Sequence, residues 1–212
     1  LYIDSGSRLS GTSSNFSIGL SGKFKQPNNY DAIVLTNASI PKSWYLIHTG
    51  NNTLTLTENS ISSTVTLTYG NYTFVTLASA LATAMNTAST AGQTFTVSGS
   101  TLTGKYTITR TVGTATTEIS FVGSKLGAVL GFEESTYSFT AGVCTSVNIV
   151  NLQAYQSILI QCNIVGGQDT VLSQIVPTIP SYTQITYVEN TPAYVSKPLN
   201  NNATNTLNFW LT

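Results

Sequence analysis

Alternation of apolar and polar residues runs through most of this chain and constrains its fold more than any other feature. Successive side chains of a β-strand point to opposite faces of a sheet, so a two-residue period marks strands that are buried on one face. The C-terminal segment is an example, because Leu207, Phe209 and Leu211 occupy every second position. The sequence therefore predicts an all-β fold.

The predicted strands combine this alternation with β-branched and aromatic residues, and Gly-containing turns separate several of them. They cover residues 15–20, 30–40, 53–57, 63–68, 94–98, 106–111, 118–122, 137–140, 146–152, 157–163, 184–188 and 206–211. We expect turns at 50–52, 98–100 and 103–105. No charged linker or low-complexity stretch divides the chain, so we expect one domain over residues 1–212, with its first and last strands close together.

One segment departs from the strand pattern. In residues 73–88, Phe74, Leu77, Leu81 and Met85 fall at helical spacing, and alanine, the best helix former, is frequent. Thr73 is a suitable N-cap, and Gly92 is suited to the far end. We expect one substantial helix here, packed against a sheet, and a shorter helical turn within 123–130.

The low charge of the chain indicates a surface suited to association. Only 8% of the residues are charged, and eight basic residues balance eight acidic ones, whereas ordinary soluble domains contain about 25% charged residues. A surface with few charges costs little to desolvate, so it favours large protein contacts. Lys23, Lys25 and Lys42 form no basic patch, so we expect no direct nucleic-acid binding. No run of 18 apolar residues is present, so we expect no transmembrane segment.

The residues that most often carry catalysis are scarce or scattered, and we expect no catalytic, cofactor-binding or metal-binding residues. His48 is the only histidine, and no Gly-x-Ser-x-Gly motif accompanies it. Glu133 and Glu134 are adjacent, so on a strand they would point apart. The pair Gly166–Gly167 lacks the ending of a phosphate loop. The remaining carboxylates considered are scattered, and a pair assembled by the fold stays open: Asp4, Asp31, Glu58, Glu118, Asp169 and Glu189.

The two cysteines and the glycosylation triplets leave alternatives open. Cys144 and Cys162 each lie in or beside an apolar run, where we expect free buried thiols, although a bridge between neighbouring strands is an alternative. Asn-x-Ser/Thr triplets arise by chance in a chain so rich in these residues, and they open at Asn15, Asn37, Asn51, Asn71 and Asn202. The eleven tyrosines fit half-buried strand positions, interface anchors or a sugar-stacking platform. A carbohydrate-binding β-sandwich, as an attachment or lectin-like module, is therefore the alternative function.

Three short blocks, in this order, carry a family resemblance. They are residues 2–8 (Tyr-Ile-Asp-Ser-Gly-Ser-Arg) leading into 10–16, residues 38–45 (Ala-Ser-Ile-Pro-Lys-Ser-Trp-Tyr), and residues 69–73 (Tyr-Gly-Asn-Tyr-Thr) running into the predicted helix. Asn52-Thr53-Leu54 lies between the second and third blocks, and Leu130-Gly131-Phe132 follows later. This order resembles the penton and minor capsid proteins of large double-stranded DNA viruses and virophages, over about the first 135 residues.

The resemblance implies a single jelly-roll β-sandwich of two antiparallel sheets without enzymatic activity or cofactor. It implies a structural subunit of the virion that assembles as a homopentamer at the vertices of an icosahedral capsid, or beneath the shell. Its partners would be the major capsid protein and other minor capsid proteins. Residues 1–14, which include Arg8, would form an N-terminal arm.

Overall fold

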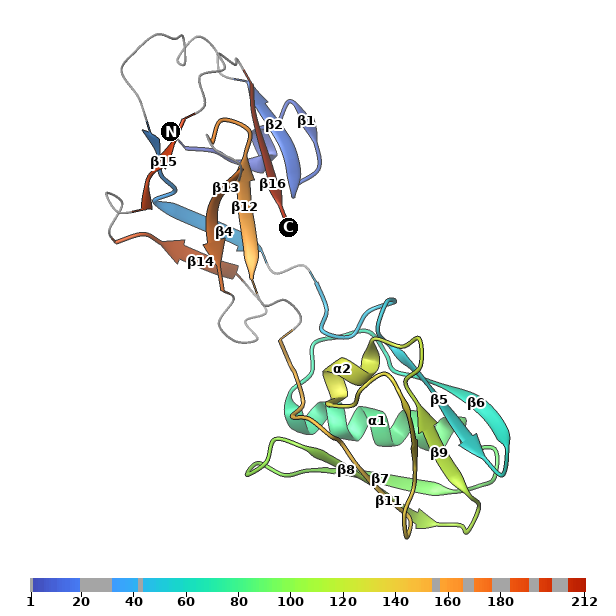
Figure 1. Ribbon diagram of the computed structural model, residues 1–212. Coiled ribbons are helices and arrows are strands. Elements are labelled where there is room, and N and C mark those ends of the chain that lie inside the picture. Colours follow the sequence, from blue (N-terminus) through green and yellow to red (C-terminus); the bar gives the residue numbers. More distant parts are fainter. Residues whose placement is uncertain are drawn as a thin grey trace. The chain divides into compact units, whose positions relative to one another are not determined.

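The computed structural model describes residues 2–19, 32–41, 44–153, 157–165, 170–176, 184–190, 195–199 and 206–212. The chain forms two compact units (Figure 1). Unit 1 contains Leu1–Lys42 and Tyr155–Thr212, and unit 2 contains Ser43–Ala154. Unit 2 is thus inserted in sequence between the two halves of unit 1, and the single domain expected over residues 1–212 stays a prediction. No charged or low-complexity linker marks either boundary, so composition alone does not reveal them.

Unit 1 contains a five-stranded antiparallel sheet and two further strand pairs. The sheet has the order β1 (Ser10–Gly11), β2 (Asn15–Gly19), β16 (Thr206–Leu211), β12 (Ile158–Cys162), β13 (Val171–Ile175). The pairs are β4 (Asn37–Pro41) with β14 (Gln184–Val188), and β3 (Ala32–Ile33) with β15 (Lys197–Pro198). A short 3-10 turn, Ser5–Ser7, precedes β1. The buried residues of β12 are Ile158, Ile160 and Cys162, which is the expected two-residue period.

The first and last long strands of unit 1 pair directly, as the sequence predicted. In β2 and β16, Phe16 lies opposite Phe209 and Ser17 lies opposite Asn208. The two phenyl rings stack with centroids 5.7 Å apart. The Ser17 hydroxyl donates a hydrogen bond to Asn208 Oδ1 at 2.8 Å. Both ends of the chain therefore contribute to one sheet.

Unit 2 contains two antiparallel sheets and two helices. One sheet has the order β10 (Thr136–Ser138), β9 (Thr117–Ser120), β5 (Thr53–Glu58), β6 (Ile61–Thr66). The other has the order β11 (Val143–Thr145), β8 (Tyr106–Val112), β7 (Thr94–Gly99). Helix α1 (Phe74–Ala88) packs against β6 and β7, and the short α2 (Leu126–Leu130) contacts β5.

Helix α1 confirms the prediction for residues 73–88. Leu77, Leu81 and Met85 are fully buried in the core of unit 2. At its start, Thr73 Oγ1 accepts a hydrogen bond from the Thr76 backbone N–H at 3.2 Å, and Thr76 Oγ1 accepts one from the Thr73 N–H at 2.8 Å. This reciprocal capping satisfies two backbone donors that a helix start leaves unpaired. At the other end the C-cap is Ser89, so the expectation that Gly92 ends the helix was wrong.

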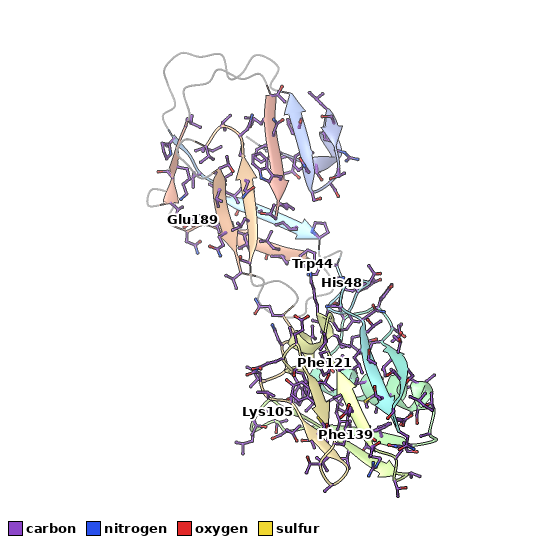
Figure 2. All side chains as sticks on the ribbon, turned by 45° about the vertical axis from the view of Figure 1, so that its right-hand side comes forward. Trp44, His48, Lys105, Phe121, Phe139 and Glu189 are labelled. Carbon is purple, nitrogen blue, oxygen red and sulfur yellow. The ribbon has the colours of Figure 1, made fainter. Side chains whose placement is uncertain are left out.

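Aromatic rings fill the core of unit 2 around β9. The rings of Phe121 and Phe132 stack with centroids 4.8 Å apart, and Tyr137 meets both edge-on (Figure 2 labels Phe121). Phe95 and Phe139 form a second edge-on pair at 5.8 Å. Since aromatic pairs of this geometry contribute beyond the area they bury, these ring contacts stabilise the core of unit 2.

The predicted strand boundaries were most accurate for strands that pair without a register shift. The predicted ranges 184–188 and 206–211 coincide with β14 and β16. The described part of the predicted strand 30–40 divides into β3 and β4, and its first two residues lie outside the described residues. The predicted strand 146–152 was wrong. Its backbone N–H groups instead bond to separate segments, as those of Ser146, Asn148 and Val150 donate to Tyr106, Gly131 and Gly104.

We predict that Thr73→Ala destabilises unit 2 by about 1 kcal/mol, because it leaves the Thr76 N–H without its side-chain acceptor. Urea unfolding followed by far-ultraviolet circular dichroism measures this change. Thr101→Ala is the matched control, since Thr101 is an exposed residue in the turn between β7 and β8. Equal stability of the two variants would show that the cap contributes nothing.

Candidate functional site

His48 shapes a turn in the structure. It is exposed, its Nδ1 accepts a hydrogen bond from the Gly50 N–H at 3.1 Å, and its own N–H donates to Asn51 Oδ1 at 2.7 Å. Figure 2 shows its side chain at one end of unit 2. Within the described ranges, no group of three or more His, Cys, Asp or Glu residues comes close enough to hold a metal ion.

Several exposed carboxylates accept hydrogen bonds from nearby groups in the fold. Asp4 accepts from the Gly6 N–H and caps the turn at Ser5–Ser7. Glu134 accepts from the Gly123 N–H, and Glu118 accepts from the Ser138 hydroxyl across β9 and β10. In unit 1, the half-buried Glu189 accepts from the Tyr187 hydroxyl at 2.7 Å. Asp31, Asp169 and the pair Gly166–Gly167 lie outside the described residues.

Glu58 is a buried carboxylate that accepts several hydrogen bonds. The sequence analysis named it only as one of several scattered carboxylates. It ends β5 with only 1% of its surface exposed. Its carboxylate accepts hydrogen bonds from the Ser89 hydroxyl at 2.7 Å and from the backbone N–H groups of Thr90 at 2.6 Å and Ala91 at 3.0 Å. The Thr90 hydroxyl donates as well. Burial by itself raises the pKa of Glu58, but these donors outweigh it and lower the pKa below its ordinary value.

A second set of polar residues continues this cluster. Thr117 lies opposite Glu58 in the β5–β9 ladder, and its hydroxyl is within 2.8 Å of Gln93 Oε1. Gln93 Nε2 and the Arg110 guanidinium both donate to the carbonyl of Ala115. Glu58 is too enclosed to meet a substrate, so the arrangement fastens the segment after α1 to the sheet.

The cysteines are free and buried, in different units. Cys144 lies in β11 of unit 2, and Cys162 lies in β12 of unit 1. Burial raises the pKa of Cys144 to about 11, and it raises the pKa of Cys162 as well. Both side chains are therefore neutral thiols at physiological pH and serve as apolar core residues, as the first of the two sequence interpretations held.

Two of the glycosylation triplets have asparagines that already serve the fold. Asn51 Nδ2 donates to the Leu46 carbonyl at 2.9 Å, and Asn71 Nδ2 donates to the Trp44 carbonyl at 3.5 Å. A glycan on either amide nitrogen would have to share that position with these contacts. Asn15 and Asn37 are exposed strand residues, and Asn202 lies outside the described residues.

The N-terminal segment folds back on unit 1. The Arg8 guanidinium donates to the carbonyls of Ser5 at 2.8 Å and Gly11 at 3.1 Å. Strand β1 then pairs with β2, and the Leu9 N–H donates to the Ser17 carbonyl. The described residues 2–14 thus contain part of a short hairpin with a turn that Arg8 stabilises, and the arm expected over residues 1–14 stays a prediction. The basic residues Lys23, Lys25 and Lys42 lie outside the described residues.

Comparison with known proteins identifies the fold. No family model and no curated protein sequence matches the chain. Among solved structures, the chain is similar to the crystal structure of the selenomethionine-labelled mavirus penton protein, with a TM-score of 0.52 and 12% sequence identity. The match covers 98% of this chain and 84% of that one. It confirms the expected fold class, a mostly β jelly-roll β-sandwich of antiparallel sheets. None of the described helices is long and apolar enough to span a membrane.

We predict that Glu58→Gln destabilises unit 2 by about 2 kcal/mol at neutral pH, because hydrogen bonds to a charged acceptor contribute more than those to a neutral one. The folded-state pKa is lowered, so this stabilisation is present above the ordinary value of 4.5 and is lost as the pH falls towards the folded value.

Thermal unfolding of both proteins across acidic and neutral pH measures the effect, with the exposed Glu118→Gln as control. The curves of the native protein and Glu58→Gln should converge in acid. A constant difference at every pH would contradict the account.

Proposed function

We propose that this chain is a viral structural protein, a penton or minor capsid subunit of an icosahedral double-stranded DNA virus, and that it acts by assembly. The observation that carries this proposal is the fold likeness to a penton protein over 98% of the chain, which includes both units. The short sequence blocks of residues 2–16, 38–45 and 69–73 support the same family independently, because they rest on residue identity.

The surface chemistry supports an assembly role. Charged residues make up 8% of the chain, and several apolar side chains of unit 2 face solvent. The most exposed of them are Leu102 at 93%, Val75 at 71% and Val122 at 68%. Such surfaces can be buried in protein contacts at low desolvation cost, because few charged side chains lose their contact with water.

The proposed assembly is a homopentamer within the virion, in contact with the major capsid protein and other minor capsid proteins. A closed ring of five copies uses two different faces of each subunit, which meet around the ring. We propose that the N-terminal segment contacts a neighbouring subunit. Because Arg8 and the residues around it form a compact hairpin, it would present a folded turn rather than an isolated strand.

We predict that the purified chain forms a discrete oligomer whose sedimentation coefficient changes little between low and high salt. The physical reason is that contacts between nearly uncharged surfaces are weakly screened by ions. Sedimentation velocity at increasing protein concentration measures both properties.

A strictly monomeric protein at its highest soluble concentration would contradict the proposal. A monomer that also binds specific sugars on a glycan array would favour the carbohydrate-binding alternative instead.

A further inference from the structure

The outer edge of β6 is an unusual feature of unit 2. In the described residues β6 pairs with β5 alone, so its second edge has no strand partner. Asn59 and Ser60 both have positive φ, as the two-residue turn of a tight hairpin requires. In such a hairpin Glu58 and Ile61 form a hydrogen-bonded pair, and such pairs alternate with pairs that are not bonded.

This alternation determines which backbone groups of β6 face outward. Counted from Glu58–Ile61, every second pair is hydrogen-bonded, so Leu56–Ser63 and Leu54–Val65 are hydrogen-bonded pairs as well. The Leu67 N–H donates to the Asn52 carbonyl at 2.8 Å, so the next pair in this series is hydrogen-bonded too. The N–H and C=O groups of Ser62, Thr64 and Thr66 therefore point away from β5. The open edge ends at Thr68, whose carbonyl accepts the Tyr72 hydroxyl.

Other strand edges of unit 2 carry features that discourage pairing, and β6 does not. The edge strands β10 and β11 are three residues long, and β7 has a register irregularity between Thr94 and Phe95. Short edges, bulges, prolines and charged residues are the usual protections against strand addition. Strand β6 is six residues long, regular in register, and free of proline and charge.

A groove of about 530 Å³ borders this edge. Ligand sites occupy about 300–1,000 Å³, so this volume is sufficient for a short peptide. One side of the groove is β6 with the residues just after it, and the other is α1 (Figure 1 shows both elements). Its lining residues carry no charge: Thr64, Thr66, Leu67, Thr68, Ser79, Ala80, Thr83, Ala84, Thr87 and Ala88.

The α1 side of the groove contributes van der Waals contacts, whereas the β6 side contributes backbone hydrogen-bonding groups. The hydroxyls of Ser79, Thr83 and Thr87 each donate to the carbonyl four residues earlier in α1. Their donor capacity is therefore used within the helix. The outward N–H and C=O groups of Thr64 and Thr66 are polar partners that only another extended backbone matches in both spacing and direction.

We propose that this groove binds an extended, uncharged peptide segment of a partner protein, which adds to β6 as a further strand. The wall formed by α1 favours a single strand, because a whole sheet joined edge to edge would meet the helix. The absence of charge among the lining residues favours a segment without Asp, Glu, Lys or Arg. This inference is independent of the proposed capsid role.

The test uses the full chain and a blocked synthetic peptide that copies β5, Thr-Leu-Thr-Leu-Thr, because β6 already pairs with that sequence through its other edge. Binding is followed by amide chemical shifts in nuclear magnetic resonance. We expect saturable shifts at Ser62, Thr64 and Thr66. The same peptide methylated on every backbone nitrogen should produce none, since it cannot donate to the edge.

Two variants locate the site. Thr64→Pro removes one outward N–H without removing a bond to β5, and it should weaken binding about tenfold. Thr83→Lys obstructs the helix wall and should also abolish the shifts, whereas Val75→Lys, an exposed residue of the same helix outside the groove, should not.

Three results would overturn the proposal. They are the absence of shifts at β6, equal shifts with the methylated peptide, or binding that Thr83→Lys leaves unchanged. A dimer of the native chain that Thr64→Pro dissociates would also overturn it, because the edge would then be occupied by β6 of a second copy.

Discussion

The pairing of β2 with β16 is the contact on which the architecture depends. It joins Asn15–Gly19 to Thr206–Leu211, so nearly the whole chain lies between two adjacent strands. Stacked rings of Phe16 and Phe209 and the bond between Ser17 and Asn208 fix the register. Since the entropic cost of closing a loop grows slowly with its length, a unit of the size of Ser43–Ala154 can be inserted without preventing closure.

Unit 2 depends on helix α1 in a comparable way. The apolar face of α1 supplies Leu77, Leu81 and Met85 to the core, and the polar cluster at Glu58 fastens the segment that follows the helix. In a chain with 8% charged residues, this one buried carboxylate satisfies the hydrogen-bonding groups of a turn that hydroxyl side chains alone would leave partly unpaired.

The sequence predicted those elements whose pattern is local. Residues 206–211 alternate strictly and form β16, and residues 73–88 have helical spacing with a threonine cap and form α1. The segment 146–152 has the same apolar content but lies across several loops, so its hydrogen bonds are set by tertiary contacts that periodicity does not encode. The division into two compact units has no comparable sequence signal, because no linker composition marks its boundaries.

Candidate sites were harder to predict than the fold. His48 was set aside as a catalytic residue because of its isolation, which stays a prediction. Glu58 looked like one of several scattered carboxylates until the structure placed Ser89, Thr90 and Ala91 around it. The open edge of β6 has a weak sequence signal, a run of uncharged β-forming residues at 61–66, but its exposure follows only from strand order.

We propose that this chain functions by assembling through a surface with few charged residues. Electron microscopy of the purified protein at high concentration tests it most directly. If the chain assembles as the proposed homopentamer, we expect closed rings whose averaged images have fivefold symmetry. Isolated monomers, or open filaments in which the contact between copies does not close, would contradict it.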